Sequence, residues 1–203
     1  GGDPGTNNQG LTAPAVLGSD QNGLTPSGGS GGVPAKPPAT GGGSQQPVVP
    51  LKVGFPSKEF KDYYLKKIRR QVPNSTKATK MKDEDIYPFK CPALGIVIRN
   101  KDGCQLDHIV PADYIAQLDG FAQLSPQQQK AMIDMDENLM LISNEANQSK
   151  QHKEIPDWHY YKAGNMPVLP EYTEQYGKLA EQLKVTAQEK IYEYNKQNTE
   201  AGM

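Results

Sequence analysis

Hydrophobic residues in the last part of the chain recur at helical spacing. The stripe consists of Tyr172, Tyr176, Leu179, Leu183, Ala187, Ile191 and Tyr194. Residues three or four positions apart lie on the same face of an α-helix, so this pattern predicts one amphipathic helix over about residues 171–198. Such a stripe could present a docking surface, but it more often packs on a core. We therefore expect this helix to cover the rest of the domain.

A shorter stripe of the same kind begins the folded part. Phe60, Tyr64 and Ile68 are spaced four residues apart, and Ser57 precedes them as a candidate N-cap. The pattern predicts a helix over residues 57–71, which Pro73 would end.

Short apolar runs between these two helices predict strands. Residues 94–99 are rich in β-branched side chains, and residues 100–103 have the Asn, Asp and Gly of a tight turn. Residues 105–110 would then be the returning strand of a hairpin, which Pro111 stops. Residues 139–142 form another short apolar run and predict a further strand.

Two further helices are expected around that last strand. Ser125 followed by Pro126 is typical of a helix start, and an apolar stripe follows at Ala131, Met132 and Met135. Residues 144–153 predict the second helix, which ends before Pro156. The chain therefore belongs to the α+β class, with short strands and flanking helices.

Residues 1–50 differ in composition from the rest. They contain 13 Gly and 8 Pro, with almost no charge and few large apolar side chains. Such a segment cannot bury enough apolar surface to offset its ordering entropy. We expect a flexible Gly/Pro-rich linker over residues 1–50 and one folded domain over residues 51–203.

Cysteine content and hydropathy restrict the class of protein. Cys91 and Cys104 are the only cysteines, too few for a disulfide scaffold or a paired structural zinc site. They could form one bridge, or they could be two half-buried thiols. No apolar run approaches the length that crosses a bilayer, so we expect a soluble protein without a membrane-spanning segment.

Basic residues concentrate at the start of the folded part. Residues 52–82 carry ten Lys or Arg against two acidic residues, a net charge of plus eight, although the whole chain has a net charge of −1. Such a block suits binding to a phosphate backbone, and it also suits an ordinary solvated helix face. Composition alone favours neither of these two interpretations.

A pair of chemically active residues lies on the strand predicted over residues 105–110. Asp107 and His108 are adjacent, so their side chains should point to opposite faces of the strand. The carboxylate could hold a cation while the imidazole faces a water molecule. Most isolated Asp-His pairs, however, are surface polar residues or include a satisfied buried histidine.

A second group follows at a fixed spacing. Asn138 precedes the strand predicted over residues 139–142, Asn147 lies nine residues further on, and Lys150 follows it by three. Together the segments DHIVP and ENLMLI and the Asn147–Lys150 pair resemble HNH endonucleases, which have the ββα-metal fold. The resemblance covers about residues 104–153, a quarter of the chain, and includes several positions in order.

The resemblance implies a role for each matching residue. Asp107 corresponds to the acidic metal ligand on the strand, and His108 corresponds to the general base. Asn138 corresponds to the asparagine that braces the loop orienting this base. Asn147 corresponds to the metal ligand on the helix, and Lys150 to a basic residue near the phosphate.

The expected cofactor is one divalent cation. A carboxylate and an amide oxygen are hard ligands, so Mg²⁺ or Mn²⁺ is favoured over Zn²⁺. Family members that bind Zn²⁺ or Ni²⁺ often have histidines four residues apart on the helix, whereas Gln151 occupies that position here. His152 could contact metal or phosphate, although a solvated histidine at a helix end is the more ordinary interpretation.

The leading interpretation is a sequence-tolerant endonuclease acting on double-stranded DNA. The basic residues Lys66, Lys67, Arg69 and Arg70 would bind the backbone. Residues 107–143 resemble the nuclease toxin modules of bacterial polymorphic toxins and secretion-system effectors. This likeness implies secretion or delivery from a bacterium, activity in the target-cell cytoplasm, and a cognate immunity protein. An RNase on the same site and a non-catalytic nucleic-acid-binding ββα module are the alternatives.

Overall fold

The computed structural model describes residues 48–69 and 86–202. The chain divides into two units, residues 1–44 and 45–203, and every described residue belongs to the second. Most of the Gly/Pro-rich segment therefore lies outside the described residues, as do Arg70 and the predicted end of the first helix at residue 71.

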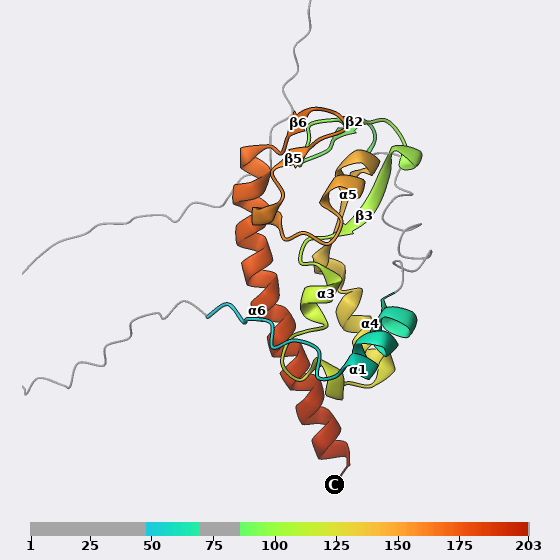
Figure 1. The fold of residues 1–203 in the computed structure, drawn as a ribbon, viewed down its shortest axis with the longest axis vertical. Coiled ribbons are helices and arrows are strands. Elements are labelled where there is room, and N and C mark those ends of the chain that lie inside the picture. Colours follow the sequence, from blue (N-terminus) through green and yellow to red (C-terminus); the bar gives the residue numbers. More distant parts are fainter. Residues whose placement is uncertain (1–47, 70–85, 203) are drawn as a thin grey trace, which may run out of the picture. The chain divides into compact units, whose positions relative to one another are not determined.

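The described part is a mixed α+β structure of helices and short antiparallel strands (Figure 1). Its α-helices are α1 (Lys58–Tyr63), α3 (Ala112–Ile115), α4 (Pro126–Ile133), α5 (Asn144–Lys150) and α6 (Pro170–Ala201). Shorter helical turns are η1 (Tyr64–Ile68), η3 (Lys101–Gly103), η4 (Phe121–Gln123), η5 (Asp136–Asn138) and η6 (Ile155–Asp157). The strands form three pairs: β1 (Phe89–Lys90) with β2 (Val97–Ile98), β3 (Cys104–His108) with β4 (Leu139–Ser143), and β5 (Tyr160–Tyr161) with β6 (Met166–Pro167).

The long C-terminal helix confirms the prediction from the apolar stripe. α6 buries Tyr172, Leu183, Ala187 and Ile191, and Figure 1 shows it running alongside α3 and α4. Removal of these side chains from water is the main stabilising term for an amphipathic helix. Within the described residues, no helix is long and apolar enough to span a membrane.

The N-terminal helix begins as predicted, but its winding changes from α-helical to π-helical at Tyr64. The Ser57 hydroxyl accepts a hydrogen bond from the Phe60 amide at 3.0 Å, so Ser57 is the N-cap. The α-helix ends at Tyr63 and continues as the π-helical turn η1. Tyr64 in this turn is buried, and its hydroxyl donates to Asp113 of α3 at 2.9 Å, which holds the two elements together.

The predicted hairpin between residues 94–99 and 105–110 is wrong. β2 pairs with β1, and β3 pairs with the distant β4, so the two runs lie in different sheets. Between them, the Asn100 side chain accepts from the Asp102 amide at 3.0 Å and caps the 3₁₀ turn η3 in place of a hairpin turn. The pairing of β3 with β4 buries Leu106 against Leu139, which stabilises the non-local arrangement.

Serine side chains cap the helices before and after β4. Ser125 and Gln128 form a capping box at the start of α4, and Ser143 caps α5 by accepting from the Ala146 amide. α5 ends at Lys150, three residues earlier than predicted, because Gln151 adopts a positive φ of 54°. The chain thus runs from β3 through α3 and α4 to β4 and directly into α5.

Both cysteines are buried free thiols. The Cys91 sulfur accepts a hydrogen bond from the Ser143 amide at 3.4 Å. The Cys104 thiol donates to the Lys101 carbonyl at 3.7 Å. Of the two alternatives, the structure therefore shows separate thiols and no bridge.

Candidate active site

The candidate site is built on β3, whose side chains alternate between two faces. Gln105 and Asp107 contact residues of α5, whereas His108 contacts the end of α4. Asp107 and His108 therefore point to opposite faces of the strand, as the two-residue period of a strand requires.

Asp107 is held in a buried ion pair. Its carboxylate Oδ2 lies 2.8 Å from the Lys150 ammonium, and the two side chains are 6 % and 0 % exposed. This distance is also within hydrogen-bonding range, so the ammonium both pairs with the carboxylate and can donate to it. Burial raises the pKa of Asp107, and Lys150 opposes that rise. Lys150 thus faces the interior in this structure, and its ammonium does not reach the solvent-facing position expected of a phosphate contact.

Lys150 also fixes the end of the strand. Its ammonium donates a hydrogen bond to the backbone carbonyl of His108 at 2.7 Å. One buried cation therefore holds both the carboxylate of Asp107 and the backbone carbonyl of the next residue, His108. The strand end that carries His108 is tied to the last turn of α5.

The imidazole of His108 has a defined tautomer. Its Nε2 lies 3.0 Å from the backbone carbonyl of Ile133, and a carbonyl can only accept a hydrogen bond. Nε2 therefore carries the proton and donates, which leaves the lone pair on Nδ1. Burial lowers the pKa of His108 to about 4, so the ring is neutral near pH 7.

Asn138 clamps the loop that follows His108. Its side chain is fully buried, accepts from the Val110 amide at 2.8 Å and donates to the Val110 carbonyl at 2.9 Å. The Asn138 backbone carbonyl also accepts from the Ile109 amide at 2.9 Å. The HNH resemblance predicts a loop-bracing role for this asparagine, and in the structure the loop that it contacts is the one at Ile109 and Val110.

Asn147 lies on the same side of β3 as Asp107 but contacts a different residue. Its amide nitrogen donates to the Gln105 side-chain oxygen at 2.8 Å, which leaves the Asn147 Oδ1 free to accept or to bind a cation. Asn147 and Lys150 are one helical turn apart and face Gln105 and Asp107, two residues apart on the strand. The sequence interpretation missed Gln105, although the same two-residue period that places Asp107 points to it.

The oxygen atoms available to a cation are few. Nowhere in residues 48–69 or 86–202 do three or more His, Cys, Asp or Glu side chains gather as a metal site. Lys150 contacts Oδ2 of the buried Asp107, so the candidate ligands are Oδ1 of the half-buried Asn147 and Oδ1 of Asp107, which an ion would share with the Lys150 ammonium. A carboxylate and an amide with water molecules fit the preference of Mg²⁺ or Mn²⁺ for oxygen. The same atoms do not fit Zn²⁺, which favours nitrogen and sulfur.

The remaining candidate residues lie outside this constellation. His152 is exposed and lines a groove of about 330 Å³ together with Asp113 and Glu154. Lys66 and Lys67 are exposed on η1. The Arg69 Nε lies 3.3 Å from Asp113 Oδ1. Of the predicted DNA-binding residues that the structure describes, Lys66 and Lys67 therefore form no ion pair, whereas Arg69 and Lys150 are each paired with an aspartate.

Stability of the metal-free protein should rise with pH between 4 and 6.5. In this window the unfolded state binds a proton at His108 and the folded state does not, so acidification favours unfolding. The difference between 6.5 and about 4 corresponds to about 3 kcal/mol. Urea denaturation at pH 4.5 and pH 7 measures it. His108→Gln keeps a donor for Ile133 and should lose this component, whereas an unchanged pH dependence would contradict the burial of a neutral His108.

Comparison with known proteins gives no relative. The chain matches no protein-family model, no curated protein and no solved structure. The site must therefore be interpreted from its own geometry and chemistry.

Proposed function

We propose that this chain is a metal-dependent endonuclease of the HNH type that hydrolyses DNA phosphodiester bonds. One observation carries the proposal: the fully buried Asn138 clamps the loop behind a neutral His108 whose Nε2 is fixed on a carbonyl. This arrangement leaves Nδ1 as an oriented base. The order of β3, β4 and α5 supports the proposal further, because it brings Asp107 and Asn147 to one side of the strand pair.

The chain's own residues supply proton transfer and orientation. His108 Nδ1 would accept a proton from the attacking water while Nε2–H remains on the Ile133 carbonyl. A bound phosphodiester places negative charge near the ring and raises its pKa from about 4 toward neutrality. Asp107 Oδ1 and Asn147 Oδ1 would hold a Mg²⁺ or Mn²⁺ ion, which would stabilise the negative charge that develops on phosphate oxygens. Because His108 points to the other face of β3, the proposal requires the strand end before Pro111 to bend so that the ion and the imidazole face one phosphate.

Incubation with nucleic acid tests the proposal. Supercoiled plasmid and total RNA are each incubated with the protein in Mg²⁺ and, as a control, in excess EDTA. We expect Mg²⁺-dependent nicking of the plasmid. Cleavage of RNA alone would favour the RNase alternative over a DNase. Cleavage of neither nucleic acid would contradict an enzyme at this site.

The proposal extends to the biological role that the resemblance implies. A nuclease of this kind would act as an antibacterial toxin delivered into the cytoplasm of a target cell. The producing cell would then require an immunity protein, with acidic residues facing the exposed Lys66 and Lys67. Expression of the chain in a bacterial cytoplasm should arrest growth, and growth at the rate of a His108→Ala control would contradict the toxin role.

Metal binding should depend on the amide of Asn147. Asn147→Ala removes one of two oxygen ligands, and loss of a direct ligand should reduce Mn²⁺ affinity by about tenfold or more, as even outer-shell changes do. Isothermal titration calorimetry with Mn²⁺ measures the change, and Gln148→Ala on the next helix position is the matched control. Asp107→Asn should have a similar effect in protein shown to be folded. Equal Mn²⁺ affinity in all three variants and the wild type would place the ion elsewhere.

DNA binding should depend on the free lysines of η1. Each phosphate contact contributes about 0.9 to the slope of log K against log salt, so Lys66→Ala with Lys67→Ala should lower that slope by up to about 2. Fluorescence anisotropy with a labelled duplex in EDTA measures the slope. Lys196→Ala, an exposed lysine near the end of α6, is the control. A slope equal to that of the wild type would remove η1 from the DNA-binding surface.

A further inference from the structure

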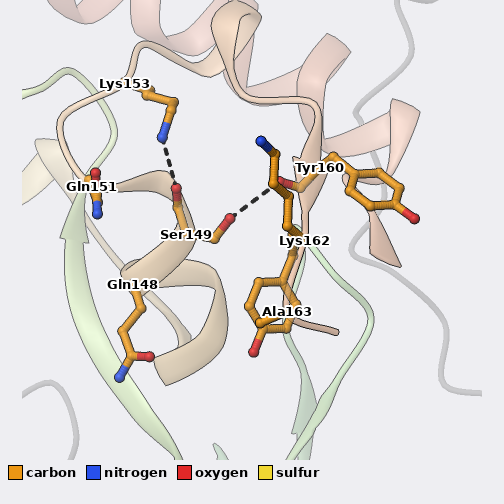
Figure 2. Close-up of a pocket in the computed structure, with 8 residues that line it drawn as sticks. Gln148, Ser149, Gln151, Lys153, Tyr160, Lys162 and Ala163 are labelled. Carbon is orange, nitrogen blue, oxygen red and sulfur yellow. Dashed lines mark hydrogen bonds between the residues drawn. The ribbon is translucent and has the colours of Figure 1, made fainter. Parts of the chain in front are cut away.

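A groove lies between the C-terminal end of α5 and the hairpin of β5 and β6 (Figure 2). Its volume is about 460 Å³, and the residues that define its chemistry are Gln148, Gln151, Lys153, Tyr161 and Lys162. Volumes of this size accommodate a nucleotide-sized ligand. None of these residues belongs to the constellation around Asp107 and His108.

Ser149 holds the two walls of this groove together. Its hydroxyl donates to the Tyr160 carbonyl at 3.3 Å and accepts from the buried Trp158 indole at 2.9 Å. The Ser149 carbonyl also accepts from the Lys153 ammonium at 3.1 Å, and Figure 2 shows the contacts with Lys153 and Tyr160 meeting at Ser149. α5 and β5 are therefore joined by side-chain contacts, and these contacts fix the walls of the groove between them.

The charge of the groove favours an anion. Lys153 and Lys162 are exposed, and no acidic residue lines the groove. Among the ion pairs of the described residues, neither lysine has a carboxylate partner. Lys153 uses one of its three N–H groups on Ser149, so two remain for a ligand. Two uncompensated ammonium groups in one groove provide the positive potential that a phosphate backbone requires.

The uncharged lining residues suit the rest of a nucleotide. Gln148 and Gln151 expose amide groups that can donate to and accept from bases or sugars. Tyr161 adds an aromatic ring, half-buried against the core, on which a base can stack. Gln148 directly follows Asn147 on α5, so the groove begins one residue from a proposed metal ligand.

We propose that this groove holds the backbone of one polynucleotide strand beside the phosphate that is cleaved. Lys153 and Lys162 bind phosphates, and Tyr161 contacts a base. The inference rests on the proposed nuclease function and names the strand-binding part of the same site. It differs from the expected contact through η1, because it places a second basic surface on the helix that carries Asn147.

Binding of a labelled duplex DNA in EDTA tests the groove directly. The double variant Lys153→Ala with Lys162→Ala should bind more weakly than the wild type, and the slope of log K against log salt should fall by about 2. The double variant Lys178→Ala with Lys196→Ala removes the same charge from exposed positions on α6 and should bind like the wild type. Equal affinity of the groove variant and the wild type would overturn the proposal, as would equal losses in both double variants.

Hydrolysis of bis(p-nitrophenyl) phosphate with Mn²⁺ separates this inference from the proposed function. This small diester does not extend along the groove, so the groove variant should hydrolyse it at the wild-type rate. A loss of small-diester hydrolysis in the variant would assign the lysines to the reaction centre and overturn a strand-binding role. Absence of hydrolysis in the wild type would count against the nuclease, while the duplex-binding result would still decide whether the groove binds a strand.

Discussion

Replacement of Lys150 by methionine should lower the free energy of unfolding by about 3–5 kcal/mol, the usual cost of removing one partner from a buried ion pair. The Lys150 side chain is fully buried, and the Asp107 side chain is 6 % exposed. Without the ammonium, Asp107 would have to remain charged without a partner or take up a proton. The backbone carbonyl of His108 would lose its donor as well.

Removal of both charges separates pairing from packing. The double variant Lys150→Met with Asp107→Leu leaves no buried charge and should recover most of the lost stability. Lys178→Met breaks an exposed pair with Glu174 and should change stability by less than about 1 kcal/mol. Urea denaturation measures all three variants. A small loss for Lys150→Met, similar to that for Lys178→Met, would contradict the burial and pairing of Lys150.

Local signals in the sequence predicted the helices well. Ser57 and Ser125 each cap a helix, and the seven-residue apolar stripe marks α6. These features depend on hydrogen bonds and spacing within a few residues, so a single sequence contains the information. The α+β class followed from the same signals.

Strand pairing could not be predicted in the same way. β3 pairs with β4, more than thirty residues along the chain, and two helices lie between them. Periodicity shows that a segment is a strand but not which strand it pairs with. A tight-turn composition at residues 100–103 favoured the wrong hairpin, although Asn100 uses its side chain to cap η3.

The sequence predicted which elements carry the candidate site residues, but it predicted less well where each side chain points. Alternation along β3 placed Asp107 and His108 on opposite faces, and the spacing from Asn138 to Asn147 placed the first just before β4 and the second within α5. The orientation of Lys150 was not predictable, because lysines are rarely fully buried. Its burial follows from the carboxylate of Asp107, which is itself hidden from solvent.

His108→Ala should produce the largest loss of activity. A positioned general base contributes about 10²–10⁴ to the rate of a hydrolytic reaction, and His108 is the neutral imidazole fixed at the end of β3. Its ring contacts the Ile133 carbonyl, whereas the Asp107–Lys150 pair lies on the other face of the strand. The variant should therefore keep its fold, its Mn²⁺ affinity and its affinity for DNA.

The most direct measurement is the initial rate of plasmid nicking in Mg²⁺ by the wild type and by His108→Ala, at equal amounts of DNA-bound protein. The proposed function predicts Mg²⁺-dependent nicking by the wild type and a rate at least about 100-fold lower for the variant. Comparable rates for the two proteins, or no nicking by the wild type, would contradict the assignment of His108 as the base of a nuclease.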